Sequence, residues 1–277
     1  MLQKTVFNEY TLIADIAGRV SLDTLGSNRV TAAAFVIETS RFEKLRIDVA
    51  KKKYPKWKNC TIEDAEAVVD FLVNEALSVS VFSVDKDTDA WRLFWESSKP
   101  LQAKIVKESH KQAGFAKPAN LAMYWLFGSV FVIATTQALK HEKGGASLYD
   151  RNNKFVIENT IICDSDIKGE ENIDVFKSIW IKHNSMEQKT NKLGIKIGTK
   201  KVHVLTEEEE PLLILADYIA GLAHSSLIIN EGRIALPLDC NSSRKLLDKL
   251  VISGKLIIND VKFDLVYDDI FGVLSNV

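Results

Sequence analysis

The sequence predicts an α/β protein with a central mixed sheet flanked by helices, and three observations support this fold class. Short segments rich in β-branched residues alternate with longer amphipathic segments, which is typical of strands that alternate with helices. The first two predicted strands follow each other closely, as in an antiparallel pair. The chain has 277 residues, of which 46% are hydrophobic and 26% charged, and this is the composition of an ordinary globular protein.

The first half of the chain is expected to open with two strands and to continue with helices. Segments 6–15 and 30–37 are apolar and β-branched, and a turn-like Gly26 lies between them. Thr61, followed three residues later by Asp64, is typical of a helix N-terminus. The other elements predicted here are a helix over 41–53, a helix over 65–77, a strand over 79–84 and a helix over 89–109.

Segment 118–139 carries no charge, and residues 121–134 within it are almost entirely apolar. The segment is just long enough to cross a bilayer, which takes about 20 residues. Several polar residues dilute it, and it lies between segments of globular character. We therefore expect a central helix covered by the rest of the domain, and no membrane partner, although a membrane-associated helix stays open as the alternative.

The second half is expected to alternate strands and helices again. Segment 155–163 is a predicted strand that ends at Asp164, and an acidic run before Pro211 favours the start of a helix over 212–223. The other elements predicted here are a helix over 173–183, an extended segment over 193–205 with a turn at Gly198, a helix over 242–251, and strands over 255–258 and 262–267. We expect one domain over 1–230, with an extension over 231–277 packed on it.

Several classes of protein are excluded or disfavoured by what the sequence lacks. No phosphate-binding P-loop, GxSxG elbow or GxGxxG fingerprint is present, so neither a hydrolase of the α/β type nor a dinucleotide cofactor is expected. Three widely spaced cysteines, Cys60, Cys163 and Cys240, have no metal-ligand spacing and indicate thiols in a reducing, cytoplasmic compartment. The oligomeric state is left open.

The net charge of −1 gives no global attraction to nucleic acid, so any such binding needs local basic patches. Segment 51–58 holds five lysines around two aromatic residues, and segment 182–201 holds several more. Lysines contact phosphates and aromatic rings stack on bases. The residues expected to bind nucleic acid are Lys51, Lys53, Trp57, Lys200 and Lys201. The alternative for both segments is an ordinary solvated face.

Asp217 stands alone in the apolar segment 212–223, LLILADYIAGLA. Its helical neighbours three and four positions away are aliphatic residues or glycine, and none can pair with a carboxylate. Burying an unpaired carboxylate costs several kcal/mol, so its partner must come from elsewhere in the fold. That partner is a neighbouring loop, an arginine such as Arg19 or Arg233, or a metal ion. His224, two turns along the same face, is expected to be structural.

Two further acids, Asp15 and Asp164, stand at the ends of predicted strands, and Asp166 is a rival to Asp164. A carboxylate cluster repels itself unless cations bind, and oxygen ligands suit Mg²⁺ or Mn²⁺. Two such ions about 3.5–4 Å apart promote phosphodiester hydrolysis. A cluster of Asp15, Asp164 and Asp217 would therefore explain the acid in the apolar helix. Taken singly, the strand-end acids are as well explained as turn or capping residues.

These segments resemble the prokaryotic domain of unknown function 3800 family, which has a ribonuclease H-like fold. LIADIAG at 12–18 is similar to its first strand, which typically ends in Asp-Glu-Ser-Gly, and IICD at 161–164 to a later strand. LADYIAG at 215–221 is similar to its C-terminal helix motif. The resemblance covers about residues 10–228. It implies a ribonuclease H-like mixed sheet with inserted helices. It also implies a nuclease whose catalytic, metal-binding acids are Asp15, Asp164 and Asp217.

The chain departs from the family pattern at Ile16, where the family usually has an acid, and at Ala17, where it has serine. Three interpretations of this departure stay open: one metal site is weakened, another acid substitutes, with Glu38, Glu66 and Asp166 as candidates, or catalysis has been lost and only the fold kept. The alternative function is an inactive ribonuclease H-like module that binds nucleic acid or a protein partner. An actin-like phosphotransferase is disfavoured because its glycine-rich nucleotide loops are absent.

Overall fold

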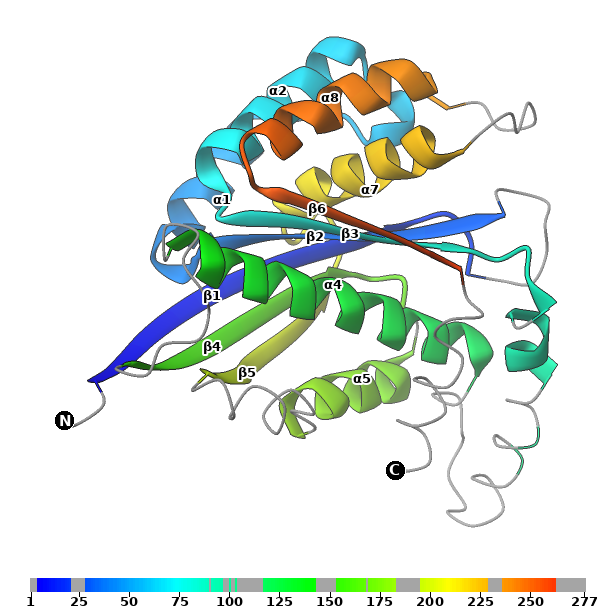
Figure 1. Cartoon of the computed structure of the whole chain (residues 1–277), viewed down its shortest axis with the longest axis horizontal. Helices are drawn as coiled ribbons and strands as arrows, with labels where there is room; N and C mark the ends of the chain where they lie inside the picture. Colours follow the sequence, from blue (N-terminus) through cyan, green and yellow to red (C-terminus); the bar gives the residue numbers. More distant parts are fainter. Residues whose placement is uncertain are drawn as a thin grey trace.

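A six-stranded mixed sheet forms the centre of the computed structural model, in the order β5-β4-β1-β2-β3-β6 (Figure 1). Strand β1 pairs antiparallel with β2, and β2 pairs antiparallel with β3. The remaining pairs, β1 with β4, β4 with β5 and β3 with β6, are parallel. The strands are β1 Lys4–Ala17, β2 Arg29–Glu38, β3 Ser78–Asp85, β4 Asn153–Asp164, β5 Ile195–Leu205 and β6 Leu256–Lys262.

The structure describes residues 4–20, 28–89, 91–96, 100, 103, 117–142, 153–167, 169–182, 195–228 and 236–262. Within them the fold class is the predicted one, a mixed sheet flanked by helices. Three antiparallel strands followed by two parallel ones, in the order β3-β2-β1-β4-β5, make a ribonuclease H-like sheet. Strand β6 is added beside β3.

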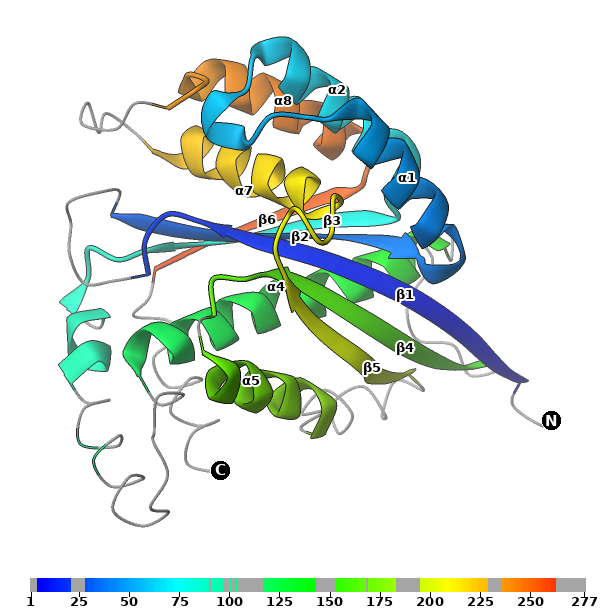
Figure 2. The same ribbon diagram turned by 180° about the vertical axis from the view of Figure 1, so that it is seen from behind.

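Helices cover both faces of this sheet (Figures 1 and 2). Helices α4 and α5 lie on one face, and α7 lies on the other, with α2 and α8 packed against α7. Each face has its own hydrophobic core, because side chains alternate along a strand. The helices are α1 Phe42–Lys52, α2 Ile62–Glu75, α4 Pro118–Glu142, α5 Glu170–Lys182, α7 Leu213–Leu227 and α8 Cys240–Ile252.

Helix α4 is long and apolar enough to cross a membrane by length and composition alone. In the structure it packs across β1, β2 and β3, and 67% of its most apolar window is buried. Hydroxyls of the sheet hold it in place, because Ser78 Oγ donates to the Ala134 carbonyl at 2.7 Å and Ser80 Oγ donates to the Val130 carbonyl at 2.9 Å. The helix is the covered central element that the sequence favoured.

Most predicted elements are present, and the exceptions are local. The first two strands form the predicted antiparallel pair, and Thr61 and Asp64 form a reciprocal capping box on α2. The predicted turn at Gly198 is wrong, since β5 runs through this residue and a bulge follows at its pairing with β4. The predicted helix over 89–109 and the strand over 262–267 lie largely outside the described residues.

Candidate metal centre

Two aspartates meet where the neighbouring parallel strands β1 and β4 end. Asp15 lies two residues before the end of β1, and Asp164 is the last residue of β4. The register pairs Ala14 with Cys163, so the two aspartates are the next residues along their strands. Ile13 and Ile162, two residues earlier, both belong to the α7-side core, and alternation places the two carboxylates on that same face.

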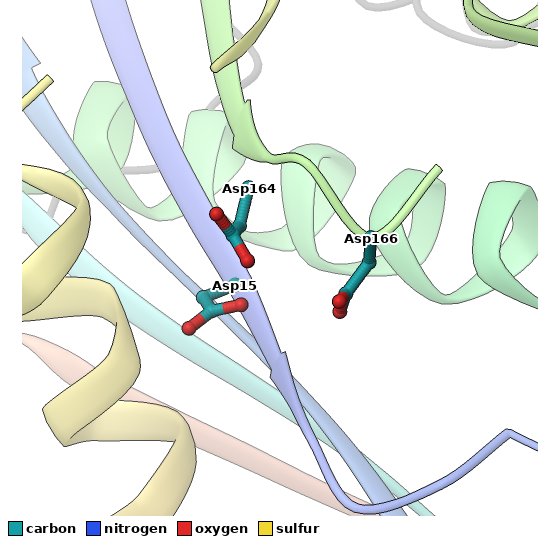
Figure 3. A group of neighbouring side chains, drawn as sticks. All are labelled: Asp15, Asp164 and Asp166. Carbon is teal, nitrogen blue, oxygen red and sulfur yellow. The ribbon is translucent and has the colours of Figure 1, made fainter. Parts of the chain in front are cut away.

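Asp166 completes a group of three (Figure 3). It lies in the turn that follows β4, and each of the three side chains offers an oxygen within 4.8 Å of the other two. Asp15 is only 7% exposed, Asp164 is half-buried and Asp166 is exposed. The group therefore extends from the core to solvent. The sequence left Asp164 and Asp166 as rivals, and the structure brings both to Asp15.

The surroundings of Asp15 disfavour its negative charge. Burial raises the pKa of Asp15 well above its usual range, and the charges of Asp164, Asp217 and Asp166 raise it further. One favourable contact opposes them, because the Ile16 N–H donates to Asp15 Oδ1 at 2.7 Å. Burial also raises the pKa of Asp164. Carboxylates that burial and neighbouring negative charges disfavour in this way are the kind that a bound cation stabilises.

Asp217 borders this group from α7. Its side chain is half-buried, and its Oδ2 accepts the backbone N–H of Trp57 at 2.9 Å. Asp217 is not one of the three residues whose oxygens lie within 4.8 Å of one another, although its charge acts on Asp15 and the charge of Asp164 acts on Asp217. Burial, followed by the charges of Glu207 and Asp164, raises its pKa to about 6. Asp217 thus caps a neighbouring loop, which was one of the partners predicted for it. It also adds negative charge beside the cluster.

The loop that Asp217 caps is anchored by Trp57. Its indole is 8% exposed and packs edge-on against Tyr218, with ring centroids 5.8 Å apart. A Cβ added at Gly221 would lie closer than 3.0 Å to the indole, so any other residue at this helix position requires the buried ring to shift. The prediction that Trp57 stacks on a base is wrong, because its ring is part of the α7-side core.

Lys56 and Glu207 are two charged residues near the cluster that sequence reasoning missed. Lys56 forms an ion pair with Glu207, and its charge also acts on Asp164 and Asp217. Glu207 opens the acidic run ahead of α7, which the sequence explained by the helix N-terminus alone. Lys56 was one lysine in a run of five. A lone proline before it, Pro55, was the only local sign that it occupies a fixed loop.

The other predicted nucleic-acid contacts are exposed on two separate elements. Lys51 and Lys53 are exposed at the end of α1, and Lys53 is held in the left-handed conformation at φ 51°. Lys200 and Lys201 are exposed on β5, beside a pocket of about 150 Å³. Lys200 Nζ lies 3.2 Å from Glu9 and 3.9 Å from Glu158, so part of its charge is already compensated.

Ile16 removes no ligand from this centre. Asp15 faces α7, whereas Ile16 belongs to the core on the α4 face together with Ala14. An acid at position 16 would point into that opposite core. Of the three proposed substitutes, Asp166 belongs to the cluster, whereas Glu38 and Glu66 are exposed elsewhere, at the end of β2 and on α2.

His224 has the structural role expected for it. It is buried, and its Nδ1 lies 3.3 Å from Thr31 Oγ1. Burial, with the charges of Lys86 and Arg29, lowers the pKa of His224 to about 4, so the ring is neutral near pH 7. The added Cβ of a residue replacing Gly18 would also meet this ring.

Comparison with known proteins finds little. No family model matches the chain, and no curated protein matches it significantly. Among solved structures it is similar to the ribonuclease H2 from Pyrococcus horikoshii OT3, at 14% identity, over 87% of this chain and 99% of that chain, with a TM-score of 0.37. Likeness at this level is no guide to chemistry. The chemistry of this centre has to be inferred from its own carboxylates.

Asp217→Asn is expected to stabilise the metal-free protein above neutral pH. The folded state holds the Asp217 proton up to about pH 6, whereas the unfolded chain releases it near about pH 4. Ionisation therefore lowers the free energy of unfolding as pH rises between these values. Asparagine removes this cost and still accepts the Trp57 N–H. We expect a gain of about 1–3 kcal/mol at pH 8 in urea denaturation with a chelator present.

The gain should fade on acidification to about pH 4, where the carboxylate is protonated in both states. Asp174→Asn, at an exposed position of α5, is the matched control and should change little at either pH. Equal or lower stability of Asp217→Asn at pH 8 would show that its charge is already compensated.

Proposed function

We propose that this protein is a divalent-metal-dependent nuclease that hydrolyses phosphodiester bonds at the cluster of Asp15, Asp164 and Asp166, bordered by Asp217. One observation carries the proposal. Three carboxylate oxygens lie within 4.8 Å of one another at the ends of two parallel strands, and one of the three side chains is buried. Such a group is costly unless a cation offsets the repulsion.

The residues present fit Mg²⁺ or Mn²⁺. All three donors are carboxylate oxygens, which these hard cations prefer, and neither histidine nor cysteine belongs to the group. Cys163, one residue before Asp164, points the other way and donates its Sγ–H to the His203 carbonyl. When bound, such an ion makes a water nucleophilic near neutral pH and offsets charge on a phosphate.

Residues of the chain position the ion and bind the substrate. Asp15 is held in one orientation by burial and by the Ile16 N–H, so it fixes the inner side of the centre. Asp166 lies on the solvent side, where a phosphodiester would approach. The exposed lysines Lys51, Lys53, Lys200 and Lys201 are the residues proposed to hold the nucleic acid through its phosphates. Membership of the domain of unknown function 3800 family and a cytoplasmic location belong to the same proposal.

The test combines metal binding with cleavage. Mn²⁺ binding is measured by calorimetry on the full chain, and labelled single-stranded and duplex RNA and DNA are incubated with Mg²⁺. We expect Mn²⁺ to bind and at least one substrate to be cleaved. Asp164→Asn should slow cleavage by more than about 100-fold, because losing a metal ligand costs more than losing the outer partner of one. Asp174→Asn, with its exposed side chain on α5, should cleave normally.

Each result has a definite consequence. If the wild-type chain binds no Mn²⁺, the proposal is overturned. If it binds Mn²⁺ and nucleic acid but cleaves none of the substrates, the inactive ribonuclease H-like module replaces the nuclease. Cleavage that survives in Asp164→Asn and in Asp15→Asn would place the chemistry elsewhere in the chain.

A further inference from the structure

One lysine is held on the Asp217 side of the carboxylate cluster. Lys56 forms an ion pair with Glu207, whose side chain is only 16% exposed. Its charge also acts on Asp164 and Asp217. The Lys56 side chain is 52% exposed, so its ammonium group reaches both the acids and solvent. The ion pair thus joins a mostly buried carboxylate to an ammonium group that is still open to solvent on the side of the cluster.

The position of Lys56 is set by the residue that follows it. The Trp57 N–H donates to Asp217, and the Trp57 ring is locked between Tyr218 and Gly221 of α7. The backbone at Lys56 is therefore fixed relative to Asp217, although its side chain is long and flexible. The ion pair with Glu207 then holds the ammonium group on the Asp217 side of the cluster.

The two sides of the centre differ in what they offer a cation. On one side, Asp15, Asp164 and Asp166 present three oxygens within 4.8 Å. On the other side, one oxygen of Asp217 is already bonded to a backbone N–H, and Glu207 is already paired with an ammonium group. A second divalent ion there would be repelled by Lys56. The second side has a positive charge of its own.

We propose that Lys56 supplies the second positive charge of this centre, so that the protein holds one divalent ion together with a lysine instead of two ions. The inference rests on the proposed function and deepens it. In the substrate complex the Lys56 ammonium donates to a phosphate oxygen, because a flexible lysine is a compact charge well suited to phosphate. Lys56 is then a residue that touches the substrate, and Trp57 and Gly221 position it.

The number of Mn²⁺ ions bound per chain tests whether Lys56 takes the place of a second ion. Mn²⁺ is titrated by calorimetry into the full wild-type chain, Lys56→Ala, Lys56→Arg and, as control, Lys58→Ala, which removes an exposed lysine two residues away. We expect one Mn²⁺ per chain in the wild type, in Lys56→Arg and in Lys58→Ala. Lys56→Ala should gain a second, weaker ion, because the acids around it lose their ammonium group. A thermal unfolding curve for each variant verifies that it is folded.

The outcomes separate this inference from the function beneath it. Two ions in the wild type, or an unchanged single ion in Lys56→Ala, would overturn the role of Lys56 and leave a metal-dependent nuclease standing. No ion in the wild type would overturn the proposed function, and the role of Lys56 with it. One ion in the wild type and two in Lys56→Ala would support both.

Discussion

Asp15→Asn is expected to make the metal-free protein more stable and to abolish its response to divalent metal. Asp15 is almost fully buried, and three other carboxylates raise its pKa beyond the effect of burial. Its ionisation therefore lowers the free energy of unfolding as the pH rises above the ordinary pKa of an aspartate. Asparagine has nearly the same shape, carries no charge and still accepts the Ile16 N–H. The gain at pH 8 should exceed that of Asp217→Asn, because Asp217 is less deeply buried than Asp15.

Divalent metal should reverse the order of stability between the wild type and Asp15→Asn. A ligand that binds only the folded state at 100 times its Kd adds about 2.7 kcal/mol to the free energy of unfolding. The wild type should gain this with Mn²⁺, and Asp15→Asn should gain almost nothing. Urea denaturation at pH 8, with chelator and with Mn²⁺, measures both changes, with Asp174→Asn as a control that behaves like the wild type. A variant that is less stable without metal, or equally responsive to it, would contradict the proposed centre.

Gly221→Ala is expected to destabilise the protein although alanine is the better helix former. Within a helix, alanine is more favourable than glycine by up to about 1 kcal/mol. However, its Cβ would lie closer than 3.0 Å to the buried Trp57 indole, and overpacking of a core costs about 1–3 kcal/mol or more. The net result should be a loss of stability, together with displacement of the Trp57 N–H from Asp217. Urea denaturation followed by tryptophan fluorescence measures the loss.

A second substitution tests the cause. Trp57→Leu in the Gly221→Ala background reduces the crowding, so the double variant should lose less stability than the two single losses together. Additive losses would mean that the contact between Gly221 and Trp57 is not what makes alanine unfavourable. Stability of Gly221→Ala equal to that of the wild type would mean that the loop relaxes without cost.

The parts of the fold that depend on local pattern could be predicted from the sequence. The close spacing of the first two strands implied an antiparallel pair, and the Thr61 capping box marked the start of α2. The turn expected at Gly198 shows the limit of such reasoning. Glycine in a strand signals either a turn or an irregularity, and here the irregularity is a bulge whose position depends on pairing with β4.

The site was predictable where it follows strand ends and unpredictable where it depends on long-range pairing. Asp15 and Asp164 meet because β1 and β4 are parallel neighbours, and each acid already stood at the end of a predicted strand. The pairing of Lys56 with Glu207 joins residues that lie far apart in the sequence, and no local pattern reveals it. A lysine-rich composition also could not reveal that Trp57 points inward.

The alternation of side chains along β1 also explains Ile16. Successive residues of a strand point to opposite faces, so an acid beside Asp15 in β1 would have faced away from it. The apolar Ile16 is therefore what a strand buried on both faces requires.

The bulge in β5 has a consequence for association between copies of the chain. Among the strands that the structure describes, β5 pairs with β4 alone and is one edge of the sheet, and β6 is the other edge. Open strand edges invite pairing with another molecule, and bulges and lysines are two devices that discourage it. Lys200 and Lys201 stand at the bulge. They therefore disfavour pairing of this edge with a strand of another chain.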